Sequence, residues 1–330
     1  MPQSFRKLRP SGLVFCCAVC LTLSQSVVMS AQQAIPSGQA QRADVRSQLL
    51  VSPEWLAKHI NDPDLVLLQV GDAEEYMNEH LPRARFASLR SISRPETHSD
   101  TALHLEMLPA EQLRTALEKL GISDNSKIVV YYGNDWVTPS TRVVFTLDYA
   151  GLGSRVVLLD GGMPAWKRSG GKVTDAVSAK TVGKLSPLQL RTPLIVDANW
   201  VKSNIGKPGI VVIDARAAGF YDGVQTGSGM TAPHRTGHIA GAKSVPFTEI
   251  ADDQNVFRSQ SELAALFAKA GVKPGDTVVT YCHIGQQGTG TLFAARLLGY
   301  PVKLYDGSFE DWSARAELPV ENPAAKGGSH

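Results

Sequence analysis

Short apolar runs alternate with amphipathic stretches along most of this chain. The apolar runs, rich in β-branched residues, fall at 65–70, 128–132, 156–159, 210–214, 277–281 and 302–305. Such runs are typical of buried parallel strands, and the amphipathic stretches between them supply crossover helices. Ser259 precedes Glu262 by three residues, which predicts a capping box at the start of one helix. The pattern therefore predicts an α/β fold in which a mostly parallel sheet is flanked by helices.

The pattern occurs twice. The gap-free matches pair residues 55–60 with 200–205, 65–71 with 210–216, 79–82 with 237–240, 112–121 with 262–271, 128–131 with 278–281, and 160–166 with 306–312. A long internal repeat of this kind predicts two tandem domains, which we place at 49–170 and 194–322. The intervening stretch 171–193, with its Gly, Ser, Lys and Pro residues, is typical of a linker.

The N-terminus has the layout of a secretory signal peptide. A basic start precedes an apolar core at 13–23, and a small, polar stretch at 24–34 follows. The apolar core is too short for a transmembrane helix, so no stable membrane insertion is expected. We predict that residues 1–31 are removed near Ser30 or Ala31, and that the protein is periplasmic or secreted.

Composition narrows the possible partners. Residues 1–31 hold three cations and no acids, so their removal takes the formal net charge from +2 to −1 (2 − 3 = −1). Without a basic surplus or an aromatic and basic patch, nucleic acid is not an expected partner. The remaining chain of about 300 residues suits two domains. Residues 32–48 are predicted to be a flexible leader and 323–330 a tail, and nothing in the sequence indicates an oligomeric state.

Cys282 is the single cysteine that remains after this cleavage, because the other three lie in the signal segment. A lone thiol in an exported protein forms no internal disulfide and is a potentially reactive sulfur. It stands where the predicted strand 277–281 gives way to a loop and a helix at 289–298, so N–H groups and the helix dipole would stabilise a thiolate. The alternative is an inert buried cysteine.

The two copies differ where chemistry would sit. The alignment places Cys282 opposite Tyr132, Asp214 opposite Gln69, and Arg216 opposite Gly71. The first copy thus keeps the apolar skeleton without the reactive side chains. We expect a catalytic second domain and a supporting first domain, in which replacing Tyr132 leaves the chemistry unchanged.

Several motifs of the second copy occur in one order: 213–216 (Ile-Asp-Ala-Arg), 237–242 (Gly-His-Ile-Ala-Gly-Ala), 281–282 (Tyr-Cys) with its short loop, and Asp306-Gly307 followed by Trp312. Together with the degenerate first copy, they resemble the rhodanese family of sulfurtransferases in its tandem two-domain form, over nearly all of residues 50–320. The resemblance implies transfer of a sulfane sulfur from a small anionic donor to cyanide or a thiol acceptor, with no cofactor.

The resemblance also implies roles for the loop. The Cys282 thiolate would attack the outer sulfur of the donor and keep it as a persulfide. The N–H groups of residues 282–287 would point at that sulfur, and Gly285 would permit the tight curve. The remaining loop side chains would line or rim the pocket: His283, Ile284, Gln286 and Gln287.

Arg216 corresponds to an arginine with which the family holds the anionic donor, and a planar guanidinium suits a sulfonate-like or carboxylate group. The alternative is a scaffold arginine bound to Asp214 or Glu310. Asp214 is interpreted as a structural acceptor for nearby donors. His238 is interpreted as a structural hydrogen-bonding residue, since the first copy has His80 at the same place.

Other shared or inserted residues receive simpler interpretations. Asp160 and Asp306 are predicted turn or cap residues. The second copy carries an insertion at 220–235 whose Gly, Thr and Ser content predicts a loop over the pocket mouth. Within it, Arg235 or His234 would add positive charge for substrate binding.

The donor is predicted to be thiosulfate, with 3-mercaptopyruvate as the alternative. The loop carries neither the cationic residues frequent in the first class nor the Gly-Ser-Gly or Gly-Thr-Gly pattern of the second, although His283 supplies partial charge near neutral pH. A Cys-dependent phosphatase would need an arginine where Gly288 stands. A sulfur-binding or redox-sensing protein is a further alternative. No Cys/His cluster has zinc-ligand spacing, so no metal site is predicted.

Overall fold

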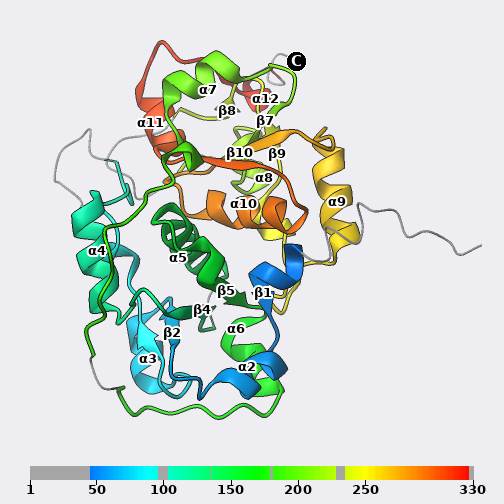
Figure 1. The fold of residues 1–330 in the computed structure, drawn as a ribbon. Helices are drawn as coiled ribbons and strands as arrows, with labels where there is room; N and C mark the ends of the chain where they lie inside the picture. Colours follow the sequence, from blue (N-terminus) through cyan, green and yellow to red (C-terminus); the bar gives the residue numbers. More distant parts are fainter. Residues whose placement is uncertain (1–44, 96–102, 135, 179–180, 228–234, 327–330) are drawn as a thin grey trace, which may run out of the picture. The chain divides into compact units, whose positions relative to one another are not determined.

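A computed structural model of the protein describes residues 45–95, 103–134, 136–178, 181–227 and 235–326 (Figure 1). Two five-stranded sheets carry the two repeats, and all neighbouring strands within each sheet are parallel. The first sheet has the order β1 (Leu50–Val51), β5 (Val156–Leu159), β4 (Lys127–Tyr132), β2 (Leu65–Val70) and β3 (Arg85–Phe86). The second has the order β6 (Ile195–Val196), β11 (Val302–Tyr305), β10 (Thr277–Tyr281), β7 (Ile210–Asp214) and β9 (Lys243–Ser244).

Helices flank both sheets. Those of the first repeat are α2 (Pro53–His59), α3 (Ala73–Asn78), α4 (Ala110–Lys119), α5 (Thr138–Tyr149) and α6 (Gly162–Arg168). Those of the second are α7 (Ala198–Asn204), α8 (Ala218–Tyr221), α9 (Gln260–Lys269), α10 (Gln287–Leu297), α11 (Ser308–Ala314) and α12 (Pro323–Lys326). Short 3₁₀ turns lie at η1 (Leu89–Ser91), η2 (Gly153–Arg155), η3 (Thr192–Leu194) and η4 (Phe247–Glu249), and β8 (His238–Ile239) pairs antiparallel with β12 (Val320–Glu321).

The predicted fold class is confirmed. All six predicted strands are present with bounds that agree to within one residue, because each is a buried apolar run. The capping box is present as well, with Ser259 and Glu262 exchanging hydrogen bonds at the start of α9. The pattern missed the edge strands β1, β3, β6 and β9, since two residues are too few to show a periodicity.

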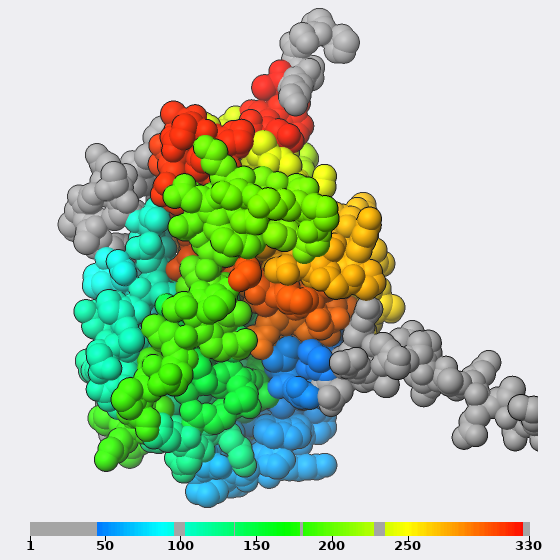
Figure 2. All heavy atoms as spheres, turned by 45° about the horizontal axis from the view of Figure 1, so that its top comes forward, coloured from blue at the N-terminus to red at the C-terminus, as the bar shows by residue number. Residues whose placement is uncertain are grey.

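The linker packs along the first repeat. Thr174 pairs with His80 through two backbone hydrogen bonds of 2.8 Å, and Ser186 N donates to the Asp124 carboxylate. Figure 2 shows the yellow-green linker lying along the surface of the repeat. These contacts satisfy backbone donors that a free linker would leave to water.

The ends of the chain depart from the predicted leader and tail. Residues 45–49 are helical, and Arg46 donates to the carbonyls of Phe257 and Arg258. The flexible leader predicted at 32–48 therefore does not extend past residue 44, and its other residues, like the signal segment 1–31, lie outside the described part. The predicted tail at 323–330 begins with helix α12. None of the helices in the described ranges is both long and apolar enough to cross a bilayer.

Helices α5 and α10 form the seam between the repeats, and they lie against each other in Figure 1. The Thr141 and Thr289 hydroxyls are 3.0 Å apart across it. One apolar cluster contains buried residues from both sides, among them Val144 of α5 and Phe293 of α10. The repeats therefore share a core instead of meeting through a polar surface.

Candidate active site

Cys282 lies at the carboxyl end of β10, directly before a loop that leads into α10. Its side chain is a free thiol and is fully buried. The Cys282 N–H donates to the Ser308 hydroxyl at 3.2 Å, and its carbonyl accepts the Phe309 N–H at 3.0 Å. The strand and the start of α11 therefore hold the backbone of the cysteine from two directions.

A cavity of about 250 Å³ opens above the thiol, and it is lined by Phe220, Gly227, Cys282, His283, Ile284, Gln286 and Gln287. Its volume lies below the range usual for drug-sized ligands, so it suits a small donor. No arginine or lysine lines it among the residues that the structure describes. An anionic ligand must therefore find its partners mainly on the loop itself.

The loop is shaped to offer N–H groups. Gly285 has a φ of +82°, a left-handed conformation that glycine adopts without steric cost. Within the described ranges, the N–H groups of Ile284, Gly285 and Gln286 donate to no protein acceptor. They lie next to the first turn of the 11-residue helix α10, whose dipole is positive at this end. The arrangement favours an anion beside Cys282.

The side chains of the predicted loop residues lie as expected, in the cavity wall. The His283 ring meets Phe220 edge-on with a centroid distance of 4.6 Å. The Gln287 Oε1 atom, a hydrogen-bond acceptor, is buried and has no partner within the described chain. Phe220 was missed as a lining residue, although the insertion that begins there was expected to cover the pocket. It lies on helix α8, not on a loop.

Ser308 was also missed. It has a φ of +53°, which a serine rarely adopts, and its hydroxyl accepts the Cys282 N–H. The equivalent residue of the first repeat is Gly162, where a Cβ would come within 2.6 Å of the Tyr132 ring. The small cysteine therefore leaves room for a serine side chain that a tyrosine excludes. The paired change, Tyr132 to Cys282 and Gly162 to Ser308, was the sequence signal for it.

The structure corrects the prediction that Arg216 holds the donor. Its side chain is buried outside the cavity, where Nη2 donates to Asp214 at 2.6 Å and to the Gly237 carbonyl at 2.7 Å. Burial by itself lowers the pKa of Arg216, but attraction to the Asp214 carboxylate raises it above its usual value. The guanidinium also stacks over the Phe309 ring at 4.1 Å. Arg216 is therefore a scaffold cation, as the alternative had it.

Asp214 lies where a structural acceptor was expected. Besides Arg216, it accepts the Tyr281 hydroxyl at 2.7 Å. Burial, and then the negative charge of Asp214, raise the pKa of Tyr281 well above its usual value. In the first repeat Gln69 accepts the Tyr131 hydroxyl at 2.8 Å in the same way. The first repeat thus has the same hydrogen bond with a neutral acceptor.

Arg235, predicted to bind substrate, does not line the cavity among the described residues. Its guanidinium donates to four backbone carbonyls, those of Trp312, Ser313, Arg315 and Leu318, at 2.8–3.1 Å. Burial lowers its pKa below the usual arginine value. These contacts fasten the end of α11 and leave the cavity without this cation. His234 lies outside the described residues.

The two shared histidines occupy structural positions. His238 Nδ1 lies 2.7 Å from the Tyr221 carbonyl, and the ring stacks on Tyr221. His80 Nδ1 lies 2.7 Å from the Tyr76 carbonyl in the same arrangement. Neither ring lines the cavity above Cys282.

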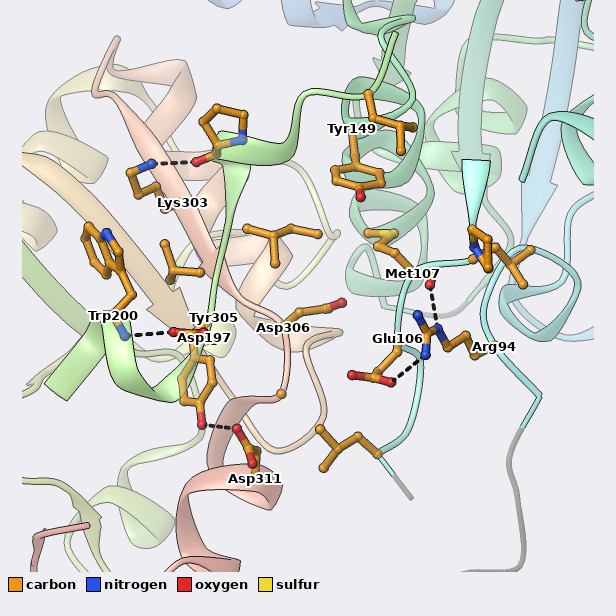
Figure 3. A pocket seen from close by; sticks show the side chains of 18 of the residues that line it. Arg94, Glu106, Met107, Tyr149, Asp197, Trp200, Lys303, Tyr305, Asp306 and Asp311 are labelled. Atoms are coloured by element: carbon orange, nitrogen blue, oxygen red, sulfur yellow. Dashed lines mark hydrogen bonds and ion pairs between the residues drawn. The ribbon is translucent and has the colours of Figure 1, made fainter. Parts of the chain in front are cut away.

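A larger cavity of about 830 Å³ lies elsewhere and does not contain Cys282. Figure 3 shows Arg94, Glu106 and Met107 of the first repeat on one side, and Asp197, Trp200 and Tyr305 of the second on the other. Its charged groups are engaged with protein partners, for example Asp311 with Tyr305 and Arg315. Size alone therefore does not identify the reactive site, which needs the thiol.

One lining residue of this larger cavity joins the two repeats. Asp306 lies in a turn, as predicted, and its Oδ1 also pairs with Arg142 Nη1 at 2.6 Å across the seam. Asp160, its counterpart, accepts the Phe257 N–H of the second repeat. No group of three or more potential metal ligands occurs in the described part of the chain.

Comparisons with known proteins agree with this geometry. The profile of the rhodanese-like domain matches residues 52–169 and 197–315. A probable 3-mercaptopyruvate sulfurtransferase of Pseudomonas aeruginosa is 32% identical over 83% of this chain and 98% of its own length. A thiosulfate sulfurtransferase of the same species is 29% identical over 83% and 97%. An anaerobic ergothioneine biosynthesis enzyme from Chlorobium limicola shares the fold with a TM-score of 0.73 and 24% identity, over 84% of this chain and 71% of that one.

Proposed function

This chain belongs to the rhodanese family and is a sulfurtransferase, and from that premise we propose that it moves the outer sulfur of thiosulfate to cyanide or a thiol through a persulfide on Cys282. The observation that carries the proposal is the free Cys282 thiol below a small cavity at the start of α10. A nucleophile needs activation and a bound donor; the helix terminus favours a thiolate, and the cavity has room for a small donor.

The reaction has two balanced steps. In the first, the Cys282 thiolate attacks the outer sulfur, a new S–S bond forms, and the S–S bond of thiosulfate breaks with its electron pair leaving on sulfite. In the second, cyanide or a thiolate attacks the outer persulfide sulfur and the Cys282 thiolate returns. Both the Cys282 thiolate and the Cys282 persulfide carry a negative charge on sulfur, so the same N–H groups stabilise both forms.

No cationic side chain of the described chain lines the cavity. An anionic donor would therefore be bound mainly by the loop N–H groups and by the positive end of the α10 dipole. His283 adds a positive charge when it is protonated. The 3-mercaptopyruvate alternative has support from relatives of that name. The phosphatase alternative loses support because Gly288, at the position that would need an arginine, packs against the Tyr281 backbone.

The test of the mechanism is the intact mass of the purified protein after incubation with thiosulfate. We expect a gain of about 32 Da, one sulfur atom, that cyanide removes and that Cys282→Ser abolishes. Tyr132→Phe is the matched control, because Tyr132 occupies the same position in the first repeat, and it should gain the sulfur normally. A gain only with 3-mercaptopyruvate would transfer the proposal to that donor. No gain with either donor would contradict the persulfide mechanism.

We further propose export, on the signal-like arrangement of residues 1–31. The mature protein isolated from its own cells should begin near residue 31, and terminal sequencing by mass spectrometry would show it. Full-length protein retaining Met1 in the cytoplasm would contradict export without affecting the sulfur chemistry.

A further inference from the structure

Arg142 links the first repeat to the active-site loop of the second. It lies on α5, and its side chain is 1% exposed. Nη1 donates to the Gly285 carbonyl at 3.1 Å and to Asp306 Oδ1 at 2.6 Å, and Nη2 donates to the Leu105 carbonyl. One guanidinium thus joins the loop, the carboxyl end of β11 and the segment before α4.

The hydrogen bond from Arg142 to the Gly285 carbonyl affects the direction of the next N–H group in the loop, that of Gln286. In a planar trans peptide, the C=O and the following N–H point in opposite directions. Arg142 holds the Gly285 carbonyl toward α5, so the Gln286 N–H of the same peptide is turned away from α5. Gln286 lines the cavity together with Cys282, and its N–H has no protein acceptor in the described ranges.

We propose that Arg142 is a positioning residue for sulfur transfer, which orients the Gly285–Gln286 peptide so that its N–H faces the Cys282 sulfur. The inference rests on the proposed function for its catalytic meaning, and it assigns the cysteine-free repeat a task in the chemistry. Arg142 itself contacts neither the thiol nor the cavity, so it acts through the loop.

The fork shape of arginine explains why this residue type stands here. A guanidinium donates in several fixed directions at once, whereas an ammonium is a compact point charge on a flexible stem. Arg142→Lys keeps a cation opposite the buried Asp306, but it does not reach both Asp306 and the Gly285 and Leu105 carbonyls in the same geometry. Charge and orientation can therefore be separated in one variant.

The test follows Cys282 alkylation by iodoacetamide as a function of pH, and sulfur transfer from thiosulfate. In Arg142→Lys we expect the midpoint of the alkylation profile to move to higher pH, because an aligned donor to the thiolate is lost. We expect kcat/KM to fall about tenfold or more, since one preorganised donor contributes 10²–10³ in comparable sites. Arg142→Met should show both effects more strongly.

Arg296→Lys is the matched control. Arg296 of α10 pairs with Asp148 of α5 at 3.0 Å across the same seam, far along the helix from the loop. This substitution removes an arginine from the same seam, and the variant should keep the alkylation profile and kcat/KM. A folded Arg142→Lys protein with wild-type values of both would overturn the proposal. If wild type accepts no sulfur from any donor, the proposed function fails, yet the alkylation profiles still decide whether Arg142 positions the loop.

Discussion

Cys282 and Tyr132 occupy the same position in the two repeats, and they differ in what they place beside the strand end. Tyr132 fills the space above its strand, and its hydroxyl donates to the Asn255 carbonyl of the other repeat. Cys282 is smaller than Tyr132, so the corresponding space in the second repeat holds the Ser308 side chain and the cavity. The same backbone therefore carries a packing residue in one repeat and a free thiol beside a cavity in the other.

Arg216→Ala tests the scaffold role of this arginine. Removing it leaves the fully buried Asp214 without its cation, and breaking a buried pair costs about 3–5 kcal/mol of unfolding free energy. We expect a lower urea midpoint, and in the folded fraction an unchanged KM for thiosulfate. A KM raised tenfold with an unchanged midpoint would restore Arg216 as a donor contact.

At the scale of elements, the loop between β10 and α10 unites the requirements of catalysis. The strand end places the thiol, the left-handed Gly285 turns the chain, and α10 supplies its positive end. The preceding apolar run and the following helix were visible in the sequence. Three loop carbonyls accept hydrogen bonds from segments distant in sequence: those of Cys282 and His283 from α11, and that of Gly285 from α5.

Gly285→Ala tests the loop at this scale. A side chain at φ +82° costs about 1–2 kcal/mol, and its Cβ would lie 2.9 Å from both Arg142 Nη1 and the Asp306 carbonyl oxygen. We expect at least a tenfold loss of kcat/KM, measured by thiocyanate formation from thiosulfate and cyanide. Gly299→Ala is the control, because its φ is +80° and a Cβ there meets nothing within 4 Å. Equal kinetic losses in both variants would contradict a loop-specific effect.

At the scale of the whole molecule, the seam packs the two repeats around a shared apolar core. Apolar residues of α5 and α10 share a core, and polar contacts surround it. His104 Nδ1 lies 2.6 Å from Glu310 Oε1 across the seam. Arg142 pairs with Asp306 across the same seam and also donates to the Gly285 carbonyl of the active-site loop. The first repeat thus has Tyr132 at the position of Cys282 and supports the second repeat through these contacts.

We expect Asp160, which accepts the Phe257 N–H of the second repeat, to make the stability of the protein depend on pH. Burial raises its pKa above the ordinary value of 3.8, although the Phe257 N–H and Arg46 oppose the shift. The folded state therefore binds this proton more tightly than the unfolded state, so the contribution of Asp160 to stability falls as pH rises from about 3.8 through the raised pKa. The free energy of unfolding of wild type minus that of Asp160→Asn should decrease over this range in urea titrations. A difference that grows with pH would contradict the assignment.

The sequence by itself determined the duplicated α/β fold, the six main strands and the position of the lone cysteine at a strand end, because apolar periodicity and an internal repeat are properties of the chain alone. It left the role of Arg216 open between donor contact and scaffold. It did not reveal Arg142, Ser308 or Phe220. Their roles depend on which segments, distant in sequence, lie next to one another in the fold. A guanidinium binds the acceptors that lie within its reach. Only the tertiary structure decided that Arg216 pairs with Asp214, and that Arg142 binds the Gly285 carbonyl and Asp306.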